Sequence, residues 1–406
     1  MKNTLLSCDD SARAIKATSW VFLGTYAFAC CWFWWLPNLL YSALGYDTGI
    51  SKWTICVSVM ALILFIFGFL LPAPPPHHSV SPTRTLELCR DFAYKATLIW
   101  SLPAFAFALQ FGMSRWNVEY GSGDRILLLH QAVLYVHLFL GTLFIGAADI
   151  NRHRKQIIIA ATVIILPRLF ISLHWGRFFL AQGALPILLI ALARGWIRIT
   201  FRRVVELSIV ALFILIVPAM TRGTKVLGVS DSGQYAVLSF LKAGDTLSFL
   251  ENNRNLPWNC PPLLVSLTAK VVPYHTLDVC TVDIGDTLKV PGVLDSLLTH
   301  AYSNDIRTGT GGNYLLELYL TGGMTAIIIG TLIFAYSCRL FLKWIGYPSL
   351  YAGIWAECLS RAFLAPRGNL GYVYERIPSL LLATYAVIVT LWMLDQLSRP
   401  LPAPAT

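Results

Sequence analysis

The feature that most constrains this chain is a series of apolar runs, many of them about 18 residues or longer. As a helix, a run of that length crosses the hydrocarbon core of a bilayer, which is roughly 30 Å thick. Hydrophobic residues make up 56% of the 406 positions and charged residues only 13%, which excludes an ordinary soluble domain. The sequence therefore predicts an all-α polytopic membrane protein.

The apolar runs predict about ten transmembrane helices and three parts. The expected spans are roughly 18–41, 53–71, 92–112, 126–148, 157–174, 178–193, 204–220, 314–337, 347–364 and 377–394. A long polar segment separates the last three of them from the rest. We therefore expect an N-terminal membrane bundle at 1–220, one large external loop at 221–312 and a C-terminal membrane bundle at 313–406.

The distribution of positive charge predicts the orientation. Lys and Arg cluster at 13–16, 84–95, 152–155, 194–203 and 339–343. With about ten spans, all of these clusters fall on the side of both termini. Because positive residues in short loops mark the cytoplasm, both termini are expected there, in a bacterial inner membrane with the large loop in the periplasm. The net charge of +10 does not indicate nucleic-acid binding, since no basic stripe is interleaved with exposed aromatic residues.

Several arginines break this charge rule and predict a binding site. Arg168 and Arg177 lie within and at the outer end of the fifth expected span, and Arg361 and Arg367 do the same around the ninth. An arginine inside a span costs at least a few kcal/mol, so it normally faces a cavity or a partner. The forked guanidinium also holds phosphate at two points. These four residues are therefore predicted to bind the pyrophosphate of a lipid-linked substrate.

Structural alternatives remain open for the same arginines. Arg168 follows Pro167, so it could instead bond main-chain carbonyl groups that a helix kink sets free. Arg177 could extend to lipid headgroups. Glu357 and Arg361 stand one helical turn apart in the order that favours an ion pair.

The stretch 300–323 supplies the acid–base candidates. It joins the polar segment to the eighth expected span and includes His300, Arg307 and Glu317 around a Gly-rich turn. A carboxylate that is partly desolvated at the mouth of a span can act as a general base, which favours Glu317, with His300 as the second candidate. Glu317 could instead neutralise Arg307. His130 and His137 lie on one face of the fourth expected span, and hydrogen bonds to neighbouring helices are expected for them.

Missing motifs narrow the chemistry. The sequence has no phosphate-binding Gly-rich loop with Lys, no His-Glu-x-x-His, no Cys-x-x-Cys and no Gly-x-Ser-x-Gly. A paired carboxylate motif is also missing from the first external loop. We therefore expect a metal-independent mechanism with no cofactor. Cys260 and Cys280 share the polar segment and could pair if that side of the membrane is oxidising.

One motif and the topology together resemble a known family. Residues 311–323 read Gly-Gly-Asn-Tyr-Leu-Leu-Glu-Leu-Tyr-Leu-Thr-Gly-Gly. This segment is similar to the Asn-aromatic…Glu…Tyr…Gly entry into a late span of the Wzy-type O-antigen polymerases. About ten spans, one large late external loop and external arginines fit the same family.

The resemblance implies a GT-C-like fold and an integral-membrane glycosyltransferase. The expected reaction moves a growing glycan from undecaprenyl pyrophosphate to a new lipid-linked repeat unit on the periplasmic face. A chain-length regulator is an expected protein partner. An O-antigen ligase that transfers to lipid A core, a flippase or transporter of lipid-linked oligosaccharide, and a structural partner in polysaccharide export remain alternatives.

Overall fold

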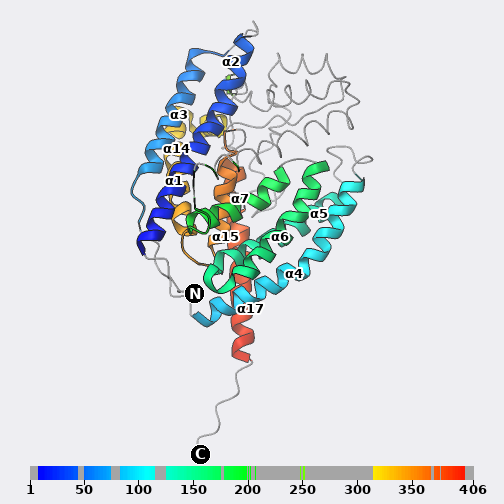
Figure 1. Ribbon diagram of the computed structural model, residues 1–406. Coiled ribbons are helices and arrows are strands. Elements are labelled where there is room, and N and C mark those ends of the chain that lie inside the picture. The colour runs from blue at the N-terminus through cyan, green and yellow to red at the C-terminus, as the bar shows by residue number, and fades with distance from the viewer. Residues whose placement is uncertain are drawn as a thin grey trace, which may run out of the picture.

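The computed structural model of this protein describes residues 8–43, 50–74, 83–114, 125–174, 178–198, 314–366, 370–374 and 376–397, with positions 200, 202, 206, 247, 250 and 251. Every regular element in these ranges is a helix (Figure 1). Six helices are long and apolar enough to cross a membrane. The described part of the chain is therefore all-helical and has several helices that could cross a membrane, as predicted for a multi-pass membrane protein. Nearly all of the seventh expected span and of the expected external loop lie outside the described residues.

The helices follow the predicted spans closely over much of the chain. They are α1 (Cys8–Cys30), α2 (Leu36–Ala43), α3 (Lys52–Leu70), α4 (Thr83–Ser114), α5 (Arg125–Ala147), α6 (Ile150–His174), α7 (Phe178–Ala193), α14 (Tyr314–Ile345), α15 (Ala352–Ala362), α16 (Leu370–Tyr374) and α17 (Ile377–Leu397). A π-helical turn, Cys31–Trp35, joins α1 to α2. For α3, α5, α7 and α17, the bounds of the expected spans agree with the observed helix bounds within a few residues.

One buried arginine joins the ends of three helices. Arg194 follows α7, and its guanidinium donates to the main-chain oxygens of Gly146 (2.6 Å) and Ala148 (3.0 Å) at the end of α5. It also donates to those of Ile345 (3.0 Å) and Tyr347 (2.9 Å) at the end of α14. Helix C-termini leave carbonyl groups without intrahelical partners, and this side chain supplies the donors. Burial lowers the pKa of Arg194 to about 9, so the group remains charged at neutral pH.

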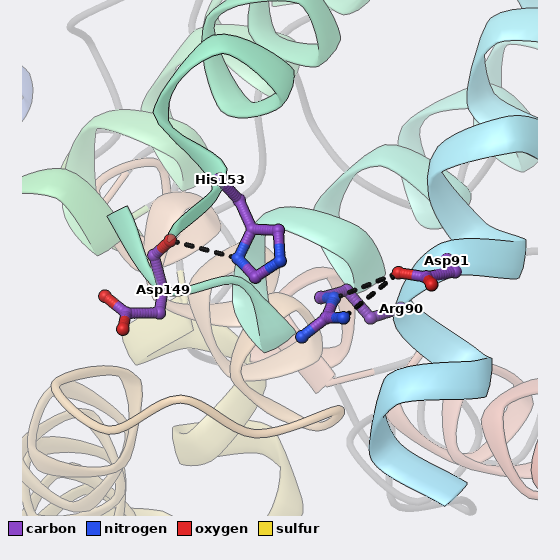
Figure 2. Close-up of polar contacts among 4 residues, drawn as sticks. All are labelled: Arg90, Asp91, Asp149 and His153. Atoms are coloured by element: carbon purple, nitrogen blue, oxygen red, sulfur yellow. Dashed lines mark hydrogen bonds and ion pairs between the residues drawn. The ribbon is translucent and has the colours of Figure 1, made fainter. Parts of the chain in front are cut away.

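The joint between α5 and α6 lies near the first turns of α4 at this same end (Figure 2). On α4, Arg90 pairs with its neighbour Asp91 at 3.1 Å. At the joint, His153 Nδ1 lies 3.1 Å from the main-chain oxygen of Asp149. The first turn of α6 is irregular, because His153 has non-helical backbone angles (φ −120°, ψ 19°).

Further basic residues of the described ranges gather at this end too. Lys343 Nζ, near the end of α14, donates to the main-chain oxygen of Ala73 beyond α3 at 2.5 Å. Arg84 at the start of α4 pairs with Asp395 near the end of α17 at 2.6 Å. We call this the basic end of the bundle; α1 begins and α17 ends there (Figure 1). The charge asymmetry that the orientation rule requires is therefore present.

The eighth expected span, 314–337, is interrupted by two glycines. Gly322 (φ −172°, ψ 33°) and Gly323 (φ 63°, ψ −150°) both leave helical geometry inside α14. The positive φ of Gly323 is a conformation that side chains with a Cβ rarely adopt. The interruption divides α14 into a short half-helix, 314–321, and a long helix, 324–345. The expectation of one continuous span at 314–337 was therefore wrong.

The half-helix folds back against the helix that follows it. The rings of Tyr314 and Phe334 lie 5.7 Å apart. In an unbroken helix, residues so far apart in sequence would be separated by about 30 Å. Leu318 packs directly on Gly330, where an added Cβ would lie 2.5 Å from the Leu318 Cδ2 atom. The half-helix therefore lies inside the bundle rather than at the mouth of a span.

The ninth expected span, 347–364, also proved to be shorter than predicted. It contains only α15, a helix of 11 residues. At 1.5 Å per residue such a helix is about 16 Å long, too short for a core of roughly 30 Å. Nearly all of its residues are buried, because α15 packs against α5, α7 and α14. A broken helix is tolerated at membrane depth when it is enclosed by protein in this way.

The close approach of α5 and α15 depends on two glycines. A Cβ added to Gly353 would lie 2.5 Å from the main-chain oxygen of Thr142. A Cβ added to Gly146 would lie 2.7 Å from the main-chain nitrogen of Gly353. Ser349 N also donates to the Gly146 oxygen at 2.9 Å. The backbones are therefore in direct contact where α15 begins.

Part of the predicted external loop 221–312 packs on the bundle. Leu247 and Leu250 are buried in the main hydrophobic core. The Glu251 carboxylate accepts hydrogen bonds from Ser51 Oγ (2.6 Å) and from Thr54 Oγ1. Because Ser51 and Thr54 form the start of α3, Glu251 caps the positive end of that helix. At least this portion of the segment is anchored to the membrane helices.

We predict that Gly353→Ala destabilises the bundle, because the new methyl group would meet the main chain of α5. Overpacking of this kind costs about 1–3 kcal/mol. The measurement is thermal unfolding of the detergent-solubilised protein. Gly24→Ala is the matched control, because nothing lies within 4 Å of its added Cβ and alanine favours a helix. Equal stability of the two variants would contradict the close approach.

Candidate functional site

Two buried carboxylates mark the interior of the bundle, and both belong to interrupted helices. Glu317 lies on the half-helix 314–321, and Glu357 lies on the short helix α15; each is 5% exposed. Ionisable residues buried at membrane depth are costly and usually mark a substrate path or a binding site. The candidate site is therefore built around these two positions.

Glu317 ties the half-helix to the start of α16. The main-chain N–H of Leu370 donates to Glu317 Oε2 at 2.6 Å. Leu370 is the first described residue of α16, and the Glu317 carboxylate satisfies its main-chain N–H. The arrangement holds Glu317 in a fixed position.

The described residues that follow α15, up to Pro366, are held beside the same half-helix. Trp34 Nε1 donates to the main-chain oxygen of Pro366 at 3.0 Å, and the rings of Trp34 and Tyr314 lie 5.9 Å apart. Arg367 follows Pro366 in the sequence and lies outside the described residues. Pro366 and Leu370 are the described residues that precede and follow Arg367. Both lie next to the half-helix that carries Glu317.

Glu357 lies among three arginines that come from separate parts of the chain. Thr142 Oγ1 on α5 donates to Glu357 Oε1 at 3.2 Å. The guanidinium groups of Arg361, Arg376 and Arg168 all attract the Glu357 carboxylate. Arg361 follows Glu357 by one turn of α15, Arg376 precedes α17, and Arg168 lies on α6. We call Glu357, Arg168, Arg361 and Arg376 the central polar cluster.

Arg168 is enclosed by protein and bonded to main-chain oxygens. It is 2% exposed, and it donates to the carbonyl oxygens of Ile164 (2.8 Å) and Leu134. Ile164 belongs to the turn before Pro167, so the carbonyl-bonding alternative describes part of its role. Gly183 on α7 leaves room for the side chain, since an added Cβ there would lie 2.4 Å from Arg168 Cδ. Arg168 thus both bonds main-chain oxygens of α5 and α6 and contributes charge to the cluster.

His137 has no hydrogen-bond partner among the described residues. Its side chain is fully buried on α5, and neither ring nitrogen is paired. The predicted hydrogen bonds to neighbouring helices are therefore wrong for His137, whose imidazole lies near Arg168. The side chain of His130 lies outside the described residues.

The predicted site residues divide into two groups. The structure describes Glu317, Arg168 and Arg361, and it brings both arginines to Glu357. The remaining candidates lie outside the described residues; they are His300, Arg307, Arg177 and Arg367, with the cysteines Cys260 and Cys280. Within the described part of the chain, no three His, Cys, Asp or Glu side chains are grouped as a metal site requires.

Sequence reasoning did not select Arg376 or Thr142 as site residues. Arg376 resembled an ordinary flanking charge, because it directly precedes an apolar span. Thr142 resembled a small residue inside a span. A signal for Arg376 exists in the charge rule itself, since an arginine at the start of the last span falls at the end opposite to the basic clusters. Only the fold shows that it approaches Glu357.

Comparison with protein families identifies one match. Residues 289–397 match the model of the family described as O-antigen polysaccharide polymerase Wzy. The match confirms the resemblance to Wzy-type O-antigen polymerases in the C-terminal part of the chain, which holds Glu317, Glu357, Arg361 and Arg376. No curated protein and no solved structure matches the chain.

We predict that Glu317→Ala lowers stability by about 1–3 kcal/mol, because the buried Leu370 N–H loses its acceptor. Glu317→Gln keeps an acceptor oxygen at the same place, so it should remain close to wild type. Thermal unfolding in detergent measures both variants. An equal loss of stability in the two variants would show that the negative charge of Glu317, rather than its hydrogen bond to Leu370, holds α16 in place.

We also predict that His137→Leu retains or raises stability, since a buried imidazole without hydrogen bonds carries a desolvation cost of about 1–3 kcal/mol. The same unfolding assay applies. His137→Ala is the comparison, because it removes the ring and leaves a cavity. Strong destabilisation by leucine would reveal a hydrogen-bonded role for the imidazole.

Proposed function

We propose that this protein is an integral-membrane O-antigen polymerase that acts on undecaprenyl-pyrophosphate-linked oligosaccharide. The observation that carries the proposal is the family match over 289–397. That range contains the two buried carboxylates and two of the arginines of the central polar cluster. A buried site that contains several arginines suits a substrate whose anionic group lies at the end of a lipid tail.

In the proposed reaction, the pyrophosphate of the donor is held by arginines. Arg168 and Arg361 contribute from the central polar cluster, and Arg177 and Arg367 are proposed to complete the set. A hydroxyl oxygen of the acceptor sugar attacks the anomeric carbon of the donor glycan, and the bond from that carbon to the pyrophosphate oxygen breaks. The arginines stabilise the negative charge that develops on the leaving pyrophosphate.

The proton released by the acceptor hydroxyl passes to a base. Glu317 is the proposed base, because it is a buried carboxylate that the Leu370 N–H holds in place. His300 is the second candidate for this role, and Arg307 is proposed to assist at the same junction. The reaction is proposed to be metal-independent, since a pyrophosphate leaving group with cationic partners has its charge neutralised by protein.

The orientation follows from the charge distribution. The basic end is proposed to face the cytoplasm, which places both termini there. The opposite end would face the periplasm of a bacterial inner membrane, where the segment 221–312 and the new repeat unit would meet. About ten spans in a GT-C-like arrangement, and a chain-length regulator as a protein partner, belong to the same proposal.

We predict that deleting the gene in its host leaves lipopolysaccharide with a single repeat unit on the core. The measurement is the ladder of surface lipopolysaccharide on a gel. A core with no repeat would favour the ligase or the flippase, and an unchanged ladder would exclude all three activities. We expect a single repeat unit because loss of a polymerase stops the addition of further repeats and leaves the transfer of the first repeat to the core intact.

Complementation with variants tests the site in the same strain. Glu317→Gln and Arg361→Gln should fail to restore the ladder while reaching wild-type levels in the membrane. Arg202→Gln is the matched control, because Arg202 is exposed and, among the described residues, pairs with Glu206 one turn away (2.8 Å). If Glu317→Gln restores a full ladder, His300 becomes the leading base. If the inactive variants are also missing from the membrane, their loss is structural.

A further inference from the structure

Two cations of α14, Arg339 and Lys343, are held at the basic end by contacts with two other helices. The Arg339 guanidinium donates to Ser19 Oγ on α1, and its carbon lies 5.7 Å from the ring centroid of Phe69 on α3. Lys343 Nζ donates to the main-chain oxygen of Ala73, just beyond α3, at 2.5 Å. Both side chains are therefore fixed where α1, α3 and α14 pack together (Figure 1).

The packing around this pair distinguishes it from ordinary flanking charges. A Cβ added to Gly346 would lie 2.6 Å from Ile15 Cδ1, so α1 packs directly against the end of α14. Arg339 and Lys343 are consequently only partly exposed, whereas Arg13, near the start of α1, is exposed. Flanking charges that only mark the orientation of a membrane protein need no such enclosure. The pair thus forms a shaped site that remains open on one side.

Both cations keep hydrogen-bond donors that the described residues do not use. An arginine side chain has five N–H donors, and a lysine ammonium has three. Within the described ranges, Arg339 makes a side-chain hydrogen bond to Ser19 and Lys343 makes one to Ala73. No described carboxylate forms an ion pair with either cation, and the two cations repel each other. A ligand with anionic oxygen atoms would use these donors and offset the repulsion.

The pair lies at the depth of the lipid headgroups. Helix α3 has 19 residues, so it is about 28 Å long, close to the roughly 30 Å of the hydrocarbon core. Its last turn, which includes Phe69, therefore marks one boundary of the core. Arg339 faces this turn, and Lys343 lies one helical turn further out. Trp20 on α1 and Leu70 on α3 are 58% and 54% exposed, which leaves apolar surface for acyl chains beside the site.

We propose that Arg339 and Lys343 bind the phosphate of an anionic phospholipid whose acyl chains lie against α1 and α3. Residues one turn apart on a helix are neighbours, so one phosphate group can accept hydrogen bonds from both. Basic pockets between transmembrane helices bind anionic headgroups in this way. The bound lipid would join the ends of three helices and stabilise the folded bundle. The site does not depend on the proposed reaction.

The test uses the delipidated full-length protein in detergent and measures the rise in its unfolding temperature with added phosphatidylglycerol. Phosphatidylcholine with the same acyl chains and inorganic phosphate are the comparison ligands, and both should have a smaller effect. Arg339→Gln and Lys343→Gln should each weaken phosphatidylglycerol binding by about tenfold, because each removes a charged hydrogen bond to the phosphate. Arg339→Lys should recover part of the loss, since it keeps the charge.

Arg152→Gln is the matched control, because it removes an exposed charge at the same end from α6. This variant should bind phosphatidylglycerol as the wild type does. If Arg339→Gln does not fold, Lys343→Gln decides the outcome, because its side chain lies near the end of α14. The proposal is overturned if the two phospholipids act equally on the wild type, or if inorganic phosphate acts as strongly as phosphatidylglycerol. It is also overturned if the variants at the site bind no more weakly than Arg152→Gln.

Discussion

Hydrogen bonds from buried side chains to main-chain carbonyl groups hold this bundle together where its helices stop. Inside a membrane no water is present to satisfy such groups, so an interrupted helix needs donors from its neighbours. Arg194 supplies them at the basic end, where α5, α7 and α14 finish. Arg168 bonds the carbonyl of Ile164 inside α6, and Trp34 bonds that of Pro366 beyond α15. These contacts allow short helices to exist at a depth where they would otherwise be too costly.

The interruptions bring the polar residues together. The glycine pair Gly322 and Gly323 turns the half-helix 314–321 inward, which buries Glu317 and aligns it with the start of α16. The short length of α15 places Glu357 and Arg361 within the bundle instead of at a surface. Discontinuous helices whose ends meet near the membrane midplane are a common way to build a site for an ionic substrate. The family match covers this arrangement.

The sequence predicted the membrane class and most helices, because long apolar runs permit few other structures. It also predicted that Arg168 and Arg361 share a site, since arginines in apolar surroundings need partners. It did not predict the fold-back at Gly323, because a run of apolar residues has the same composition whether it crosses the membrane once or doubles back. It assigned Arg194 to a cytoplasmic charge cluster, whereas burial makes this arginine a link between helix ends.

The sequence by itself determined that the chain crosses a membrane several times, that its positive charge gathers at one end, and that a few arginines lie where charge is unfavourable. These properties follow from composition and order along the chain. Only the tertiary structure decided that Arg168, Arg361 and Arg376 meet at Glu357 and that the guanidinium of Arg376 lies over the ring of Tyr135. The physical reason is that such contacts depend on where helices break and which faces then pack, and local sequence does not specify the partner across the bundle.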